Sequence, residues 1–195
     1  MPIQDKVILV EKAPDGTVKK ARRLGEQGFT VVATYAPEDD WTDDVGTAGA
    51  DVVVIESPRV DERLLAQVKA VSERSPVPIA LFSDDDETGK IFAAVEAGVN
   101  AFFTGKPING SLRHAIDVAS AEFTTRRALL GELDRVSAAL AERKVVERAK
   151  GIVMKTRALD EAEAYRMMRQ VAMSRNIRMA QLAEVIIEAE DLLKT

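Results

Sequence analysis

The sequence predicts an α/β doubly wound domain that is followed by a small all-α domain, and two patterns support this fold class. In the first 120 residues, five short runs rich in valine, isoleucine and phenylalanine alternate with amphipathic helical stretches. Such alternation of short apolar strands with helices is typical of a parallel sheet that is covered by helices on both faces. After residue 120, apolar residues recur at helical spacing to the end of the chain.

The five apolar runs are the expected strands of the parallel sheet. They cover residues 6–11, 29–35, 51–56, 78–83 and 100–104. Helical patterns between them cover roughly 16–27, 60–73 and 87–97, while the segment between the second and third strands is short and acidic and has the weakest helical pattern. Five strands in about 115 residues match the flavodoxin-like doubly wound fold, in which functional groups lie at the C-terminal ends of the strands.

A single long helix is predicted from about residue 109 to 156, because this stretch contains no proline and few glycines. Within it, four apolar residues follow the 4-3-4 spacing of coiled-coil positions a and d, namely Leu129, Leu133, Val136 and Leu140. This seam predicts a short parallel coiled coil and hence a homodimer. Packing of the same residues against the protein's own helices is the alternative.

The remainder of the chain predicts two shorter helices. Asp160, with Glu163 three residues later, forms a capping-box start in which Asp replaces the usual Ser or Thr. Asn176 is a suitable left-handed stop for this helix, and a last helix covers roughly 179–193. The expected organisation is a doubly wound domain over 1–120, a helical linker over 121–142 and a three-helix domain over 143–195.

Composition and charge restrict the class of protein. A chain of 195 residues with 46% hydrophobic and 30% charged residues is typical of a soluble globular protein. It has no cysteine, no apolar run near 18 residues and no secretion signal pattern, so we expect a cytoplasmic protein that does not enter a membrane. The first 120 residues carry a net charge of −7 and the remaining 75 a net charge of +2. This division suggests an anionic partner for the C-terminal part, although solvated helix faces would produce the same charge.

The C-terminal residues follow the pattern of a known family. The pattern comprises a basic residue, Ala-Lys-Gly, Met, Ala with Tyr or Phe, Arg, an Ala/Ser-Met pair and a closing Leu and Ala. The corresponding residues here are Arg143, Ala149-Lys150-Gly151, Met154, Ala164-Tyr165, Arg169, Ala172-Met173, Leu182 and Ala183. Over about 55 residues without a gap, this stretch resembles the ANTAR domain (AmiR and NasR transcription antitermination regulator). With its N-terminal part, the whole chain resembles the NasT-like ANTAR-domain response regulators, which carry a CheY-like receiver.

This resemblance implies a function that the motifs themselves do not state. It implies a transcription antitermination regulator that binds hairpins in leader mRNA, with a nitrate or nitrite assimilation operon as the expected target. It also implies a protein without catalytic activity or cofactor. The expected partner is an inhibitory nitrate- or nitrite-sensing protein that controls the regulator.

Helical spacing indicates which side chains of this domain would meet RNA. The candidate RNA-binding residues are Lys150, Arg169, Tyr165, Arg143, Ala172, Arg175 and Arg178. Arg143 and Lys150 lie seven residues apart and share one face of the first helix. On the second helix, Tyr165, Arg169 and Ala172 supply a ring for stacking, a cation for phosphate or a base edge, and a small residue for close contact. The alternative is that Tyr165 belongs to the apolar core with only its hydroxyl exposed.

The predicted receiver lacks the residues that phosphorylation requires. An active receiver has paired acids after the first strand, Asp after the third, Ser or Thr after the fourth and Lys after the fifth, and its acids hold Mg²⁺. The corresponding residues here are Glu11, Lys12, Glu56, Ser83 and Lys106. Lys12 places a cation where a metal ligand is needed, and Glu56 either replaces the phosphorylated Asp or is the nearest surviving acid. We therefore expect a degenerate phosphorylation site and control by a protein partner.

Several other classes of function are less consistent with the sequence. A DNA-binding response regulator needs a recognition helix with polar base-reading side chains, whereas the last helix carries Glu184, Glu188, Glu190 and Asp191. The sequence has no motif of a nucleotide-binding, metalloprotease or nucleophilic enzyme. The acidic run 84–86 is interpreted as a solvated loop and not as a metal site. A purely protein-interacting regulator with a solvated basic face is the remaining alternative.

Overall fold

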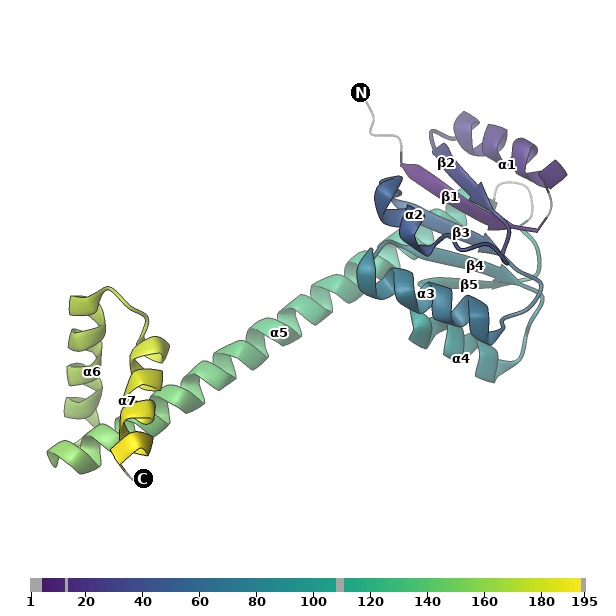
Figure 1. Cartoon of the computed structure of the whole chain (residues 1–195). Coiled ribbons are helices and arrows are strands. Elements are labelled where there is room, and N and C mark those ends of the chain that lie inside the picture. The colour runs from purple at the N-terminus through teal and green to yellow at the C-terminus, as the bar shows by residue number, and fades with distance from the viewer. Residues whose placement is uncertain (1–4, 13, 108–110, 194–195) are drawn as a thin grey trace. The chain divides into compact units, whose positions relative to one another are not determined.

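The computed structural model describes residues 5–12, 14–107 and 111–193 of the chain (Figure 1). The chain divides into two compact units, residues 1–127 and 128–195. Helix α5 (Ser111–Arg157) contributes to both units, and the predicted linker over 121–142 lies within it. Within the described residues, no helix combines the length and the apolar character that are needed to cross a membrane.

The first unit contains a parallel sheet of five strands, which confirms the predicted fold class. The strands are β1 (Lys6–Glu11), β2 (Thr30–Tyr35), β3 (Val52–Glu56), β4 (Ile79–Ser83) and β5 (Ala101–Thr104), in the order β2-β1-β3-β4-β5. The strand order reverses between β1 and β3, and in doubly wound folds this reversal leaves a crevice at the C-terminal ends of the strands. We therefore expect a functional site at the residues that end β1 and β3.

Four complete helices and the start of α5 cover this sheet. The helices are α1 (Pro14–Glu26), α2 (Thr42–Thr47), α3 (Glu62–Arg74) and α4 (Thr88–Ala97). Along β1, Ile8 packs with residues of α2, α3 and α4, whereas Val7 packs with residues of α1 and α5. The side chains of a strand alternate between the two faces of its sheet, so almost every strand residue here has to be apolar. The weakly predicted helix between β2 and β3 is α2, held by the fully buried Trp41 and by Val45.

The second unit consists of the C-terminal part of α5 together with α6 (Glu161–Arg175) and α7 (Met179–Leu193). Its core combines three alanines with two large apolar residues, namely Ala149, Met168, Ala172, Leu182 and Ala183. The predicted capping box is present, because the Asp160 carboxylate accepts a hydrogen bond from the Glu163 backbone N–H and the Glu163 carboxylate accepts one from the Asp160 backbone N–H. Asn176 ends α6 in the left-handed conformation, as predicted.

The core of the second unit leads to a stability prediction. We expect Met168→Ala to lower the free energy of unfolding by about 2–5 kcal/mol, since truncating a buried methionine removes packing and leaves a cavity. Met173→Ala on the same helix is the matched control, because the Met173 side chain is 71% exposed. Urea unfolding of the full chain, followed by far-ultraviolet circular dichroism, measures both changes. Equal destabilisation by the two substitutions would contradict the assignment of Met168 to the core.

Candidate functional site

The sheet register brings two carboxylates together at the strand-order reversal. Glu11 is the last residue of β1 and Glu56 the last residue of β3, and the two are direct partners in the parallel pairing. The Glu11 side chain is only 5% exposed, while that of Glu56 is 23% exposed. Two like charges so close and so poorly solvated would repel each other without a counter-charge.

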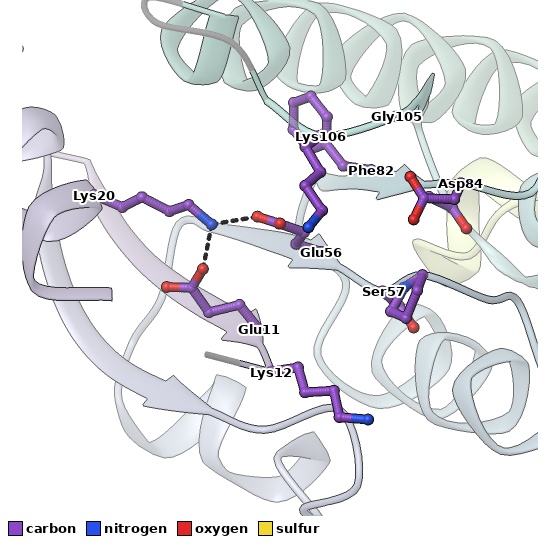
Figure 2. Close-up of a pocket in the computed structure, with 11 residues that line it drawn as sticks. Glu11, Lys12, Lys20, Glu56, Ser57, Phe82, Asp84, Gly105 and Lys106 are labelled. Carbon is purple, nitrogen blue, oxygen red and sulfur yellow. Dashed lines mark hydrogen bonds and ion pairs between the residues drawn. The ribbon is translucent and has the colours of Figure 1, made fainter. Parts of the chain in front are cut away.

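Lys20 of α1 supplies that counter-charge. Its ammonium group forms ion pairs with both Glu11 and Glu56, as Figure 2 shows. Burial lowers the pKa of Lys20, but the hydrogen bonds and charges of the two glutamates outweigh this effect, so the pKa is raised above its ordinary value. Lys20 is therefore a stable cation at neutral pH. The sequence analysis missed it, because no spacing along the chain indicates which α1 residue faces the strand ends.

The predicted phosphorylation-site residues line a single cavity of about 440 Å³ (Figure 2). They are Glu11, Lys12, Glu56, Ser83 and Lys106, and Lys20 joins them there. The Ser83 side chain is almost fully buried, and its hydroxyl accepts a hydrogen bond of 3.2 Å from the Asp85 backbone. Lys12 and Lys106 are both exposed. The charged residues that line the cavity are thus three lysines, two glutamates and Asp84, and β3 ends in Glu56 instead of an aspartate.

The residues at this cavity do not fit a divalent cation. A receiver fold implies Mg²⁺ bound by acidic oxygens, and Mg²⁺ requires nearly octahedral oxygen ligands. Here an ammonium group already lies between the two carboxylates. The described parts of the chain also contain no group of three or more His, Asp or Glu side chains that could hold a metal ion. No step of phosphoryl transfer is therefore assigned to this site.

The acidic run 84–86 joins two loops at the same edge of the sheet. The Asp85 carboxylate accepts a hydrogen bond of 2.6 Å from the Val60 backbone and pairs with Lys90 at 2.9 Å. The hydrogen bond from Val60, followed by the one from Lys90, lowers the pKa of Asp85. Asp84 and Asp86 are exposed. The middle acid of this run thus ties the loop after β4 to the loop after β3.

In the second unit, the predicted RNA-binding residues fall into two groups. Lys150 of α5 is nearly buried, and its ammonium pairs with Glu147 and, at 2.8 Å, with Glu161 at the start of α6. These hydrogen bonds, Glu147 first, raise the pKa of Lys150. Ala172 is 3% exposed and belongs to the core. The structure therefore places Ala172 inside the domain and not on a surface with Tyr165 and Arg169.

The remaining candidates lie on the surface of the second unit. Tyr165 is 45% exposed, so it is not a core residue with only its hydroxyl in solvent. Arg143, Arg169 and Arg175 are exposed, and none of them forms an ion pair within the described chain. Arg178 is exposed and pairs with Glu142 at 3.2 Å, which joins the start of α7 to α5.

The exposed face of α6 contains a residue that the sequence analysis did not select. Tyr165, Arg169 and Met173 lie four residues apart and share one face of the helix. Met173 is 71% exposed, although methionines of a small domain are usually buried. Met173 belongs to the family pattern, but it was not among the candidate RNA-binding residues. Tyr165, Arg169 and Met173 are called the α6 face below.

Comparison with known proteins identifies the second unit. The model of the ANTAR domain family matches residues 134–187. The chain is 28% identical over 171 residues to the transcriptional regulatory protein PdtaR of Mycobacterium tuberculosis (strain ATCC 25618 / H37Rv), which covers 86% of this chain and 82% of PdtaR. It is 34% identical over 64 residues to the nitrate regulatory protein of Klebsiella oxytoca, which covers 33% of this chain and 16% of that protein.

The fold of the first unit also has a solved counterpart. The signal receiver domain of a modulated diguanylate cyclase from Desulfovibrio desulfuricans G20 superposes with a TM-score of 0.54 at 11% identity, covering 64% of this chain and 99% of that one. This likeness concerns the fold alone. The chain thus has the two parts of an ANTAR-domain response regulator, a CheY-like receiver fold and a matched ANTAR domain.

Proposed function

We propose that this protein is an RNA-binding regulator of transcription antitermination, and that the α6 face contacts the loops of hairpins in a leader mRNA. One observation carries the proposal: a ring, a guanidinium and a thioether are exposed in one row on a helix whose opposite side is buried in the core. Unpaired loop bases stack on aromatic rings and guanidinium planes, and phosphates attract arginine. The rigid helix would present these groups in one orientation.

The basic residues around the α6 face would contribute unequally. Arg143 and Arg175 are exposed and could reach phosphates directly. Arg178 and Lys150 are already paired with glutamates, and Lys150 is nearly buried. Each would have to exchange a carboxylate for a phosphate in order to bind RNA. We therefore assign the larger share of RNA affinity to Tyr165 and Arg169. Lys150 would mainly position α6 on α5.

Control of this regulator would come from a protein partner and not from phosphorylation. The lysine-paired carboxylates at the ends of β1 and β3 support this part of the proposal. The similarity to a nitrate regulatory protein supports an assimilation operon for nitrate or nitrite as the target, and a nitrate- or nitrite-sensing protein as the inhibitory partner. Binding to a nascent transcript would place the protein in the cytoplasm.

The proposed active form is a homodimer that is joined along α5. Leu129, Leu133, Val136 and Leu140 are each between 54% and 67% exposed, so this apolar row is not buried by the protein's own helices. This exposure supports the dimer over the alternative, in which these residues pack against the protein's own helices. A second copy with the same row would bury it as a two-stranded coiled coil.

RNA binding is tested by a mobility-shift titration against a two-hairpin leader RNA and a duplex DNA of equal length, over a range of salt. We expect salt-dependent binding to the RNA alone. The double variant Tyr165→Ala with Arg169→Ala should weaken RNA binding by roughly 10- to 100-fold, because a lost base stack is worth about 1–3 kcal/mol. Its binding should also depend less on salt, because a phosphate contact is lost.

Two further variants make this test specific. Arg148→Ala is the matched control, since it removes an exposed arginine of the same unit that pairs with Asp191 and lies outside the α6 face. Lys150→Ala should cost less affinity than Arg169→Ala. Equal weak binding to RNA and DNA in all variants would contradict the RNA-binding proposal and would favour a purely protein-interacting regulator. Preferential binding to the duplex would favour a DNA-binding one.

The dimer is tested by sedimentation equilibrium. Leu133→Asp places a charge in the apolar row and should convert a dimer into a monomer, because a buried charge without a partner is strongly unfavourable. Ala138→Asp is the matched control, since Ala138 lies on the opposite side of the same exposed stretch of α5. A native chain that is monomeric at tens of micromolar, without RNA and with RNA, would exclude the proposed dimer.

A further inference from the structure

The ion pairs of Lys20 differ from an ordinary surface salt bridge in how many elements they join and in how little of the site is exposed to solvent. Lys20 comes from α1, whereas Glu11 and Glu56 end two different strands, so one ammonium group joins three elements. The Lys20 side chain is 21% exposed and that of Glu11 only 5%. One oxygen of Glu11, Oε1, is buried and has no hydrogen-bond partner among the described residues. The carboxylate of Glu11 therefore depends on Lys20 for its compensation.

The strand pairing makes a cation necessary at this position. Glu11 and Glu56 are neighbours in the register of β1 and β3, so the pairing of these two strands fixes their backbone positions side by side. Two adjacent carboxylates with little solvent need either a proton or a positive charge between them. The nearby Lys12 and Lys106 line the same cavity, but neither forms an ion pair with these carboxylates within the described chain.

We infer that Lys20 is a tethered cation that stands in for a divalent metal ion at the end of the sheet. It neutralises the two strand-end carboxylates from within the chain, so that the folded domain neither requires nor accepts Mg²⁺ at this position. The net charge of the cluster formed by Lys20, Glu11 and Glu56 would then stay the same at any concentration of metal ion or phosphate donor. This inference concerns the first unit and is independent of RNA binding.

The test compares thermal unfolding and metal binding of the full chain and its variants. Lys20→Met should lower the melting temperature by roughly 5 °C or more, because a nearly buried carboxylate loses its partner. Lys12→Met is the matched control, since it removes a lysine that lines the same cavity. Calorimetric titration with Mg²⁺ and Mn²⁺ should give no binding to the native chain or to Lys12→Met. Millimolar Mg²⁺ or Mn²⁺ should raise the melting temperature of Lys20→Met by several degrees.

A triple variant separates the loss of the counter-charge from a general defect in folding. Lys20→Met together with Glu11→Gln and Glu56→Gln removes all three charges and should recover most of the lost melting temperature, without any response to metal ions. The inference is overturned if Mg²⁺ stabilises the native chain, or if Lys20→Met melts at the temperature of Lys12→Met. It is also overturned if the triple variant is as unstable as Lys20→Met, since Lys20 would then be needed for something other than the two carboxylates.

Discussion

The position of β1 inside the sheet, between β2 and β3, is the constraint on which the first unit depends. β1 pairs with β2 on one side and with β3 on the other, and its residues from Val7 to Val10 are almost completely buried. Such a strand needs helices on both faces of the sheet and permits polar groups only where it ends. Its last residue, Glu11, is therefore held beside Glu56 by the backbone pairing itself. The cavity and the position of Lys20 follow from that register.

The two units differ in what determines their candidate sites. In the first, lysine and glutamate groups neutralise one another at the ends of the strands, which leaves little for a phosphoryl group or a metal ion to recognise. In the second, the core is built from alanines around Met168 and Leu182, so the helices can pack closely. Capping at Asp160 and Asn176 defines both ends of α6. A helix that is held in this way can present Tyr165 and Arg169 without rearrangement.

The fold was predictable from sequence because each of its elements has a local cause. Apolar runs identified the strands, and the capping box and Asn176 identified the limits of α6. The candidate sites were less predictable. Helical spacing indicated a row of side chains on α6, but it did not indicate which side of the helix is exposed. Ala172 was therefore grouped with Tyr165, although Ala172 packs in the core and Met173 is the exposed residue. Lys20 could not be recognised at all, since its role depends on how α1 lies against two strand ends.

The exposed apolar row of α5 has a consequence for how a transcript with two hairpins would be bound. Two chains joined along this row would carry two α6 faces in one assembly. Once the first hairpin is held, the second face meets the second hairpin at an effective concentration set by the RNA between them, on the order of millimolar for a short flexible spacer. Avidity of this kind can exceed the affinity of a single face by roughly 10²- to 10⁴-fold. The spacing of the hairpins, more than the sequence of either loop, would then decide which transcripts are recognised.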